Sequence, residues 1–178
     1  MNFFIQSLTY FRILTAPIIF IFITSFDLYG WGLILFLLAS ISDYWDGFLA
    51  RRYKLESVLG AVVDPIADKM LITFVVLAIS IELSSTFVGF LGGIILVREF
   101  WVGALRDLNA RNKNSEATKV SSIAKIKTTL QFITFTSYLF GLYLNNALIL
   151  FISNFLLFLA LIVTLQTGLS YTIATFRK

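Results

Sequence analysis

Cysteine and histidine are both absent from this chain of 178 residues. Their absence excludes disulfides, thiol nucleophiles, thiolate or imidazole metal ligands and the side chain that most often acts as a base near neutral pH. Any chemistry must therefore use oxygen ligands together with lysine and arginine. The metal ions that this composition leaves open are hard divalent cations, Mg²⁺ or Mn²⁺.

Charged residues are also scarce. They make up 13% of the chain, whereas hydrophobic residues make up 58% and aromatic residues 16%. This balance is far from that of a soluble domain and is typical of an integral membrane protein. Since a spanning helix needs about 20 mostly apolar residues, we expect a single transmembrane domain over residues 1–178 and no separate soluble domain.

Apolar runs separated by short polar breaks predict an all-α fold of six transmembrane helices. The expected spans cover residues 7–25, 29–50, 59–81, 86–105, 122–143 and 146–174. The first run has no basic segment before it and no small-residue cleavage site after it. This pattern indicates a retained helix rather than a removable signal peptide.

The charges in the polar breaks alternate along the chain. Lysine and arginine are missing from residues 26–30, 82–87 and 143–146, but they occur in residues 51–54 and 106–119 and at the C-terminus. By the positive-inside rule, both termini and the basic breaks are expected on the cytoplasmic side of the inner membrane. Because the basic residues lie at helix ends, the net charge of +4 indicates attraction to anionic lipids and predicts no nucleic acid partner.

Residues 42–70 contain four aspartates in an otherwise apolar part of the chain. Helix positions three or four apart share a face, which predicts one stripe of aspartates and small residues on the second helix and another on the third. The stripes consist of Asp43, Asp46, Gly47 and Ala50, and of Gly60, Asp64 and Asp68. A tight turn over residues 51–56 would make the two helices antiparallel neighbours with facing stripes near the cytoplasmic boundary.

Carboxylates at that depth repel one another and are costly to keep ionised away from water. A divalent cation would remove this cost, and the small residues beside the aspartates leave space for a polyanionic ligand. The candidate ligands are Asp43, Asp46, Asp64 and Asp68. The structural alternative is an interfacial charge cluster in which these aspartates pair with nearby arginine and lysine.

The spacing Asp43-x2-Asp46-Gly47-x2-Ala50-Arg51-x8-Gly60-x3-Asp64-x3-Asp68 resembles, at every fixed position, the signature of the CDP-alcohol phosphatidyltransferases. The resemblance implies a six-helix membrane bundle, usually dimeric, in which the first three aspartates hold one or two divalent cations on the pyrophosphate of a CDP-linked donor. It also implies that Asp68 is the general base that deprotonates the acceptor alcohol. The CDP-binding side would comprise Asp43, Asp46, Gly47, Ala50, Arg51 and Gly60.

Four segments, at residues 8–17, 64–70, 98–106 and 124–131, are similar to the phosphatidylglycerophosphate synthases of bacteria, a group within this family. This resemblance implies transfer of the phosphatidyl group of CDP-diacylglycerol to sn-glycerol 3-phosphate, with release of CMP. An anionic acceptor requires further cations. The candidates are Arg98, Arg106, Lys125 and Lys127. Because the two lysines are two positions apart on a helix, at most three of the four are expected at one phosphate.

Three other functions remain open from the sequence alone. A different acceptor, such as phosphatidylglycerol in a cardiolipin synthase, would use the same aspartates. An ion-coupled transporter also places acids in the membrane, although here they gather at one edge. An intramembrane prenyltransferase would need a second aspartate-rich motif, and none follows Asp68.

Overall fold

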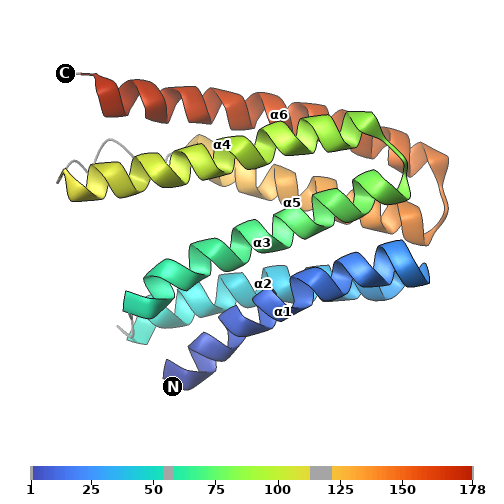
Figure 1. The fold of residues 1–178 in the computed structure, drawn as a ribbon, viewed down its shortest axis with the longest axis horizontal. Coiled ribbons are helices and arrows are strands. Elements are labelled where there is room, and N and C mark those ends of the chain that lie inside the picture. The colour runs from blue at the N-terminus through green and yellow to red at the C-terminus, as the bar shows by residue number, and fades with distance from the viewer. Residues whose placement is uncertain (1, 54–57, 113–121, 178) are drawn as a thin grey trace.

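The computed structural model of the chain describes residues 2–53, 58–112 and 122–177. Within these ranges the backbone forms six long helices and no strand (Figure 1). The helices are α1 (Asn2–Phe26), α2 (Tyr29–Tyr53), α3 (Val58–Glu82), α4 (Thr86–Arg111), α5 (Ser122–Tyr143) and α6 (Ala147–Phe176). The prediction of an all-α fold with six helices is therefore confirmed, and each expected span corresponds to one helix.

Short turns join α1 to α2, α3 to α4 and α5 to α6 at one end of the bundle, whereas both termini lie at the other end (Figure 1). Each turn contains a small polar residue with positive φ, namely Asp27 (55°), Ser84 (45°) and Asn145 (47°). Ser85 and Asn146 follow as N-caps, because their side chains accept hydrogen bonds from the first backbone amides of α4 and α6. The polar breaks therefore end one helix and begin the next within a few residues.

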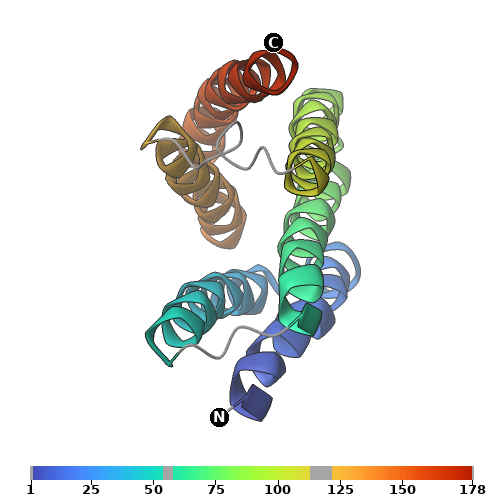
Figure 2. The same ribbon diagram turned by 90° about the vertical axis from the view of Figure 1, so that its left-hand side faces the viewer.

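The six helices form two groups of three. In one group α1 packs against α2 and α3, and in the other α6 packs against α4 and α5 (Figure 2). The groups meet mainly where α2 contacts α5 and where α3 contacts α4. The sequence predicts α2 and α3 as direct neighbours, but in the structure α1 packs extensively against both. Side chains of α1 therefore belong to any site that α2 and α3 share.

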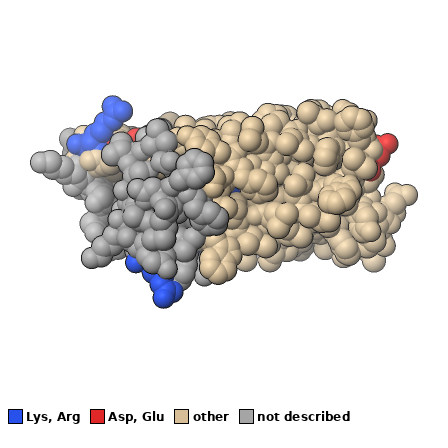
Figure 3. Space-filling model, turned by 90° about the horizontal axis from the view of Figure 1, so that it is seen from below, with Lys and Arg blue, Asp and Glu red and all other residues tan. Residues whose placement is uncertain are grey.

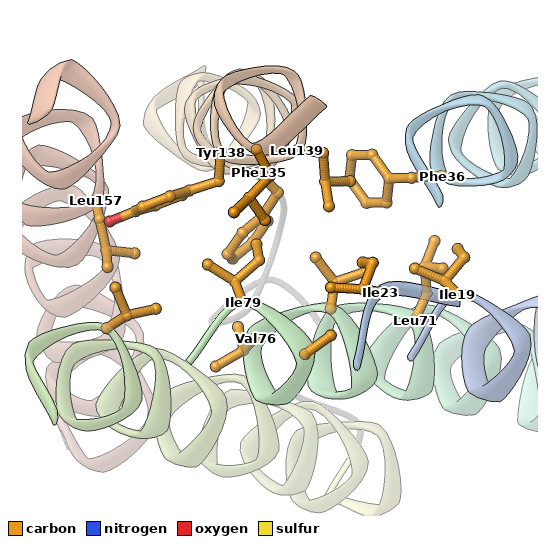
Figure 4. Packing of buried hydrophobic residues seen from close by; sticks show 14 of the residues in the cluster. Ile19, Ile23, Phe36, Leu71, Val76, Ile79, Phe135, Tyr138, Leu139 and Leu157 are labelled. Atoms are coloured by element: carbon orange, nitrogen blue, oxygen red, sulfur yellow. The ribbon is translucent and has the colours of Figure 1, made fainter. Parts of the chain in front are cut away.

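The apolar core fills the space between the two groups. Side chains from α1, α2, α3, α5 and α6 point toward one another there, including Ile23, Phe36, Ile79 and Phe135 (Figure 4). Phe36 of α2 also stacks on Phe132 of α5, with ring centroids 5.8 Å apart. This packing fixes the two groups relative to each other by apolar burial.

The middle of the bundle also exposes large apolar side chains, among them Leu38, Val97, Phe158 and Ile162. On the face shown in Figure 3, the charged side chains gather toward the two ends and leave an almost uncharged belt between them. Among the described residues, three segments are long and apolar enough to cross a membrane, and these are Ser7–Phe26, Thr86–Arg111 and Ala147–Phe176. The fold is accordingly that of an integral membrane helical bundle.

Candidate active site

Three of the predicted aspartates converge on an arginine of α1. We call Asp43 of α2 and Asp64 and Asp68 of α3 the acidic cluster. Arg12 donates through Nη1 to Asp43 Oδ1 at 2.5 Å and to Asp68 Oδ1, and its Nη2 lies 3.7 Å from Asp64 Oδ1. Thr9, one turn before Arg12, donates to Asp64 Oδ1 at 2.6 Å. Two polar residues of α1 therefore hold carboxylates that come from two other helices.

The cluster has a buried side and an open side. The Arg12 side chain is fully buried, with 0% exposure, whereas those of Asp43, Asp64 and Asp68 are 50%, 38% and 47% exposed. The guanidinium therefore lies beneath the carboxylates. In their contacts with the described side chains, Asp43 and Asp64 use Oδ1, and the second oxygen of each is placed to bind a ligand on the open side.

Arg12 is not among the site residues predicted from the sequence, although the chain carries one signal for it. Arg12 is the single charged residue in the 25 residues of α1. A permanently charged side chain within a span is costly unless it is paired or faces a polar site. The isolated arginine therefore indicates a buried polar site, although it does not identify the partner.

Four predicted donor-binding residues lie outside the side chains that the structure describes, and these are Asp46, Gly47, Ala50 and Arg51. Their roles remain predictions. Gly60 is described and lies in the first turn of α3, four residues before Asp64. It shares the stripe of Asp64 and Asp68, as the spacing predicts.

A second charged cluster lies between α4, α5 and α6. Lys127 of α5 donates to Glu99 Oε1 of α4 at 2.5 Å, and Arg98 Nη1 donates to the same oxygen at 3.1 Å. Arg98 also donates through Nη2 to Thr167 of α6 at 2.6 Å. Arg98 and Lys127 are both buried. Two of the predicted acceptor cations are thus gathered around one carboxylate, and we call Arg98, Arg106, Lys127 and Glu99 the basic cluster.

Arg106 belongs to this cluster but is exposed. Its guanidinium lies over the ring of Tyr171 of α6, with 5.8 Å between Cζ and the ring centroid. Arg106 lies two turns beyond Glu99 on the same face of α4. Lys125 is exposed on another face of α5 from the buried Lys127, so the structure brings together three of the four predicted acceptor cations.

Glu99, the carboxylate at the centre of the basic cluster, was not selected from the sequence. It follows Arg98 directly in an apolar part of the chain. Adjacent residues of opposite charge inside an apolar span indicate a buried polar site. Its partner Lys127 is 28 positions away on another helix, and no local spacing predicts that pairing.

Lys69 follows Asp68 on α3, and its side chain reaches α4. Its Nζ lies 5.1 Å from the centroid of the Phe100 ring. It also lies against Gly103, where an added Cβ would be only 2.6 Å from Nζ. The α3–α4 contact therefore brings the helix that carries Asp68 next to the helix that carries Arg98 and Glu99.

Comparison with known proteins relates this arrangement to one family. The family model for CDP-alcohol phosphatidyltransferase matches residues 6–166, a stretch that contains both clusters. The chain belongs to the CDP-alcohol phosphatidyltransferase family. The aspartate motif from Asp43 to Asp68 lies within the matched stretch. Its helices α2 and α3 supply the acidic cluster.

Three curated proteins that are similar to this chain carry the name "CDP-diacylglycerol--glycerol-3-phosphate 3-phosphatidyltransferase". A protein of Rickettsia bellii is 38% identical over 141 residues, which are 79% of this chain and 76% of the relative. One of Rickettsia felis is 36% identical over 167 residues, covering 92% and 90%. One of Salmonella choleraesuis is 31% identical over 168 residues, again covering 92% and 90%. The similarity therefore extends over most of each chain.

The acidic cluster fits a divalent cation by its chemistry and charge. Its donors are all carboxylate oxygens, which Mg²⁺ and Mn²⁺ prefer. In the part of the site that the structure describes, three carboxylates contact the positive charge of Arg12, so these four groups carry an excess of two negative charges. Among the described side chains, no three acidic groups already surround one point as metal ligands. The fourth aspartate of the motif, Asp46, lies outside them.

Proposed function

We propose that this chain transfers the phosphatidyl group of CDP-diacylglycerol to sn-glycerol 3-phosphate, giving phosphatidylglycerophosphate and CMP. The observation that carries the proposal is the presence of two clusters of opposite net charge in one family framework. The three carboxylates of the acidic cluster together with Arg12 carry an excess of two negative charges, and the basic cluster carries an excess of two positive charges when the exposed Arg106 is counted with Arg98, Lys127 and Glu99. The shared name of the relatives supports the same pair of substrates.

The basic cluster supports a phosphomonoester as acceptor. A phosphomonoester carries about two negative charges near neutral pH, and three cations with one carboxylate balance that charge. Arginine adds bidentate hydrogen bonding to phosphate oxygens, which lysine cannot provide. A neutral alcohol such as free glycerol would leave the buried cations uncompensated, and the cluster therefore favours the phosphorylated acceptor.

The acidic cluster supports the transfer step. The acceptor hydroxyl oxygen attacks the phosphorus that bears diacylglycerol, the bond from this phosphorus to the CMP oxygen breaks, and the hydroxyl proton passes to the Asp68 carboxylate. Asp43, Asp46 and Asp64 would hold the divalent cation, with Asp68 beside them. When bound, Mg²⁺ or Mn²⁺ neutralises charge on the pyrophosphate of the donor. Arg12 holds Asp43 and Asp68 on its own guanidinium and so sets the position of the base relative to the ligands.

The clusters lie in the half of the bundle nearer the two termini, judged by their places along each helix. We assign this end to the cytoplasm, because the basic breaks of the sequence lie there and glycerol 3-phosphate is a water-soluble substrate. The proposed setting is a multi-pass protein of the inner membrane that acts as a homodimer. Labelling of single cysteines introduced at Asn145 and Arg177, from opposite sides of sealed vesicles, tests the orientation in a chain with no cysteine of its own.

The function is tested with purified protein, CDP-diacylglycerol, Mg²⁺ or Mn²⁺ and separate acceptors, with CMP release as the measurement. The acceptors are glycerol 3-phosphate, phosphatidylglycerol, glycerol, serine and inositol phosphate. We expect CMP release with glycerol 3-phosphate and none when EDTA replaces the metal. A protein that consumes phosphatidylglycerol and ignores glycerol 3-phosphate would contradict the proposed acceptor and leave the acidic cluster in its role.

A further inference from the structure

Arg12 is placed so that any cation bound by the acidic cluster must lie beside it. Its guanidinium contacts the Oδ1 atoms of Asp43 and Asp68 directly and lies within ion-pair distance of Asp64. Arginine does not lose its proton in proteins. The cluster therefore holds a permanent positive charge of its own, supplied by a helix that carries no other charged residue.

We propose that Arg12 is the resident counter-cation of the acidic cluster: it stabilises the metal-free protein and it opposes divalent cation binding at the same carboxylates. This inference rests on the metal site of the proposed function. It adds that affinity for the metal is held below what the carboxylates alone would give. In the metal-free protein, Arg12 does part of the charge neutralisation that a divalent cation does in the bound form.

Two effects of removing Arg12 oppose each other, and the structure indicates which one dominates. Loss of the guanidinium removes its repulsion of a bound divalent cation. This repulsion is proportional to the product of the two charges and falls only with the inverse of the distance between them. The opposing effect is looser positioning of the carboxylates. Asp43, Asp64 and Asp68 lie on α2 and α3, which the apolar core also fixes through Phe36, Leu71 and Val75. The repulsion is therefore the larger effect.

The first experiment is a titration of EDTA-washed protein in detergent with Mn²⁺ alone, in which electron paramagnetic resonance measures the free ion. We expect Arg12→Gln to bind Mn²⁺ about tenfold more tightly than the parent, or more. Arg12→Lys, which keeps the charge, should remain near the parent. Arg111→Gln, which removes an exposed positive charge at the end of α4, is the matched control and should bind as the parent does. A purely structural role for Arg12 would weaken Mn²⁺ binding instead.

Thermal unfolding of the same proteins gives a second measurement. Without metal, Arg12→Gln should unfold at a lower temperature than the parent, because the repulsion among its carboxylates is no longer offset by the charge of Arg12. On addition of Mn²⁺ its unfolding temperature should rise more than that of the parent, because a tighter ligand stabilises the folded state more. Equal rises in the two proteins would contradict the proposal.

A second pair of variants covers the case in which Arg12→Gln does not fold, because its double variant loses one charge of each sign. Asp68→Asn and the double variant Arg12→Gln/Asp68→Asn differ only in the guanidinium, and the double variant should bind Mn²⁺ more tightly than Asp68→Asn. If a folded protein without Arg12 binds Mn²⁺ equally or less tightly, the counter-cation role is wrong and the metal site stands. If the parent shows no saturable Mn²⁺ binding, both this inference and the metal site are wrong.

Discussion

The acidic and basic clusters both combine side chains of opposite charge, but they differ in the sign of their net charge and in their exposure to solvent. In the first, three carboxylates surround Arg12, whereas in the second Arg98 and Lys127 contact Glu99 and Arg106 lies at the exposed edge over Tyr171. In the acidic cluster the carboxylates are roughly half exposed above a buried guanidinium, whereas in the basic cluster Arg98 and Lys127 are buried and their shared partner Glu99 is partly buried. The acidic cluster is therefore open to a ligand on one side, and the basic cluster is nearly closed.

This difference in exposure predicts which substitutions change activity alone and which also lower the stability of the protein. An aspartate of the acidic cluster can be replaced by asparagine with a small change in buried charge, because its side chain is already partly solvated. Removal of Arg98 or Lys127 leaves Glu99 with an incomplete set of buried partners, which costs stability as well as binding. Variants of the two clusters should therefore be compared at matched folded fractions.

The largest effect is expected in the acidic cluster. Asp43→Asn and Asp64→Asn should each abolish CMP release, since each removes a charged ligand for the divalent cation. Turnover is measured with saturating CDP-diacylglycerol and glycerol 3-phosphate. Asp107→Asn removes an exposed carboxylate of α4 and serves as the control with parental activity. Turnover in either cluster variant at the level of the control, or full turnover in EDTA, would contradict the proposed metal site.

Asp68→Asn should lower kcat by about a hundredfold while retaining binding of Mn²⁺ and CDP-diacylglycerol. The substitution removes the proton acceptor but keeps a hydrogen-bonding side chain of nearly the same size beside Arg12. Binding of CDP-diacylglycerol is measured in the absence of acceptor, so that no transfer occurs. If Asp68→Asn lost donor binding as completely as Asp43→Asn, Asp68 would be a metal ligand and not the base.

In the basic cluster, Lys127 and Lys125 form a matched pair on one helix. Lys127→Gln should raise the KM for glycerol 3-phosphate about tenfold or more, the effect of losing one hydrogen bond to a charged group, while the KM for CDP-diacylglycerol stays near that of the parent. Lys125→Gln removes the same charge from an exposed position and should change neither constant much. Arg98→Gln should resemble Lys127→Gln. Equal effects of the two lysine variants would mean that net charge at this end of the bundle matters, and not the cluster.

Much of the fold could be predicted from the sequence because each span is long, apolar and bounded by polar residues. Turns such as the one at Asn145, with its following cap Asn146, carry their own local signals. The spacing of Asp64 and Asp68 likewise predicts a shared helix face. These features depend on residues close together in the chain, and the structure agrees with them.

The centres of both clusters could not be predicted in the same way. Arg12 and Asp43 are 31 positions apart, and Glu99 and Lys127 are 28 apart. Such pairs depend on how each helix is rotated and on which helices are neighbours, and the sequence predicts α2 against α3 where α1 packs against both. Only the cost of an unpaired charge in an apolar span pointed to Arg12 and Glu99, and it did not identify their partners.

The smallest effect is expected at the exposed edge of the basic cluster, where Arg106 lies over the ring of Tyr171. A cation over an aromatic ring at a partly exposed site contributes about 0.5–1 kcal/mol, which corresponds to about a two- to fivefold change in an equilibrium constant. Tyr171→Leu removes the ring and should raise the KM for glycerol 3-phosphate by that factor, because Arg106 is then held less firmly. Tyr171→Phe keeps the ring and should leave the KM unchanged. If Tyr171→Phe raised the KM as much as Tyr171→Leu, the hydroxyl group of Tyr171 would be the important feature and the stacking of Arg106 would have no role in acceptor binding.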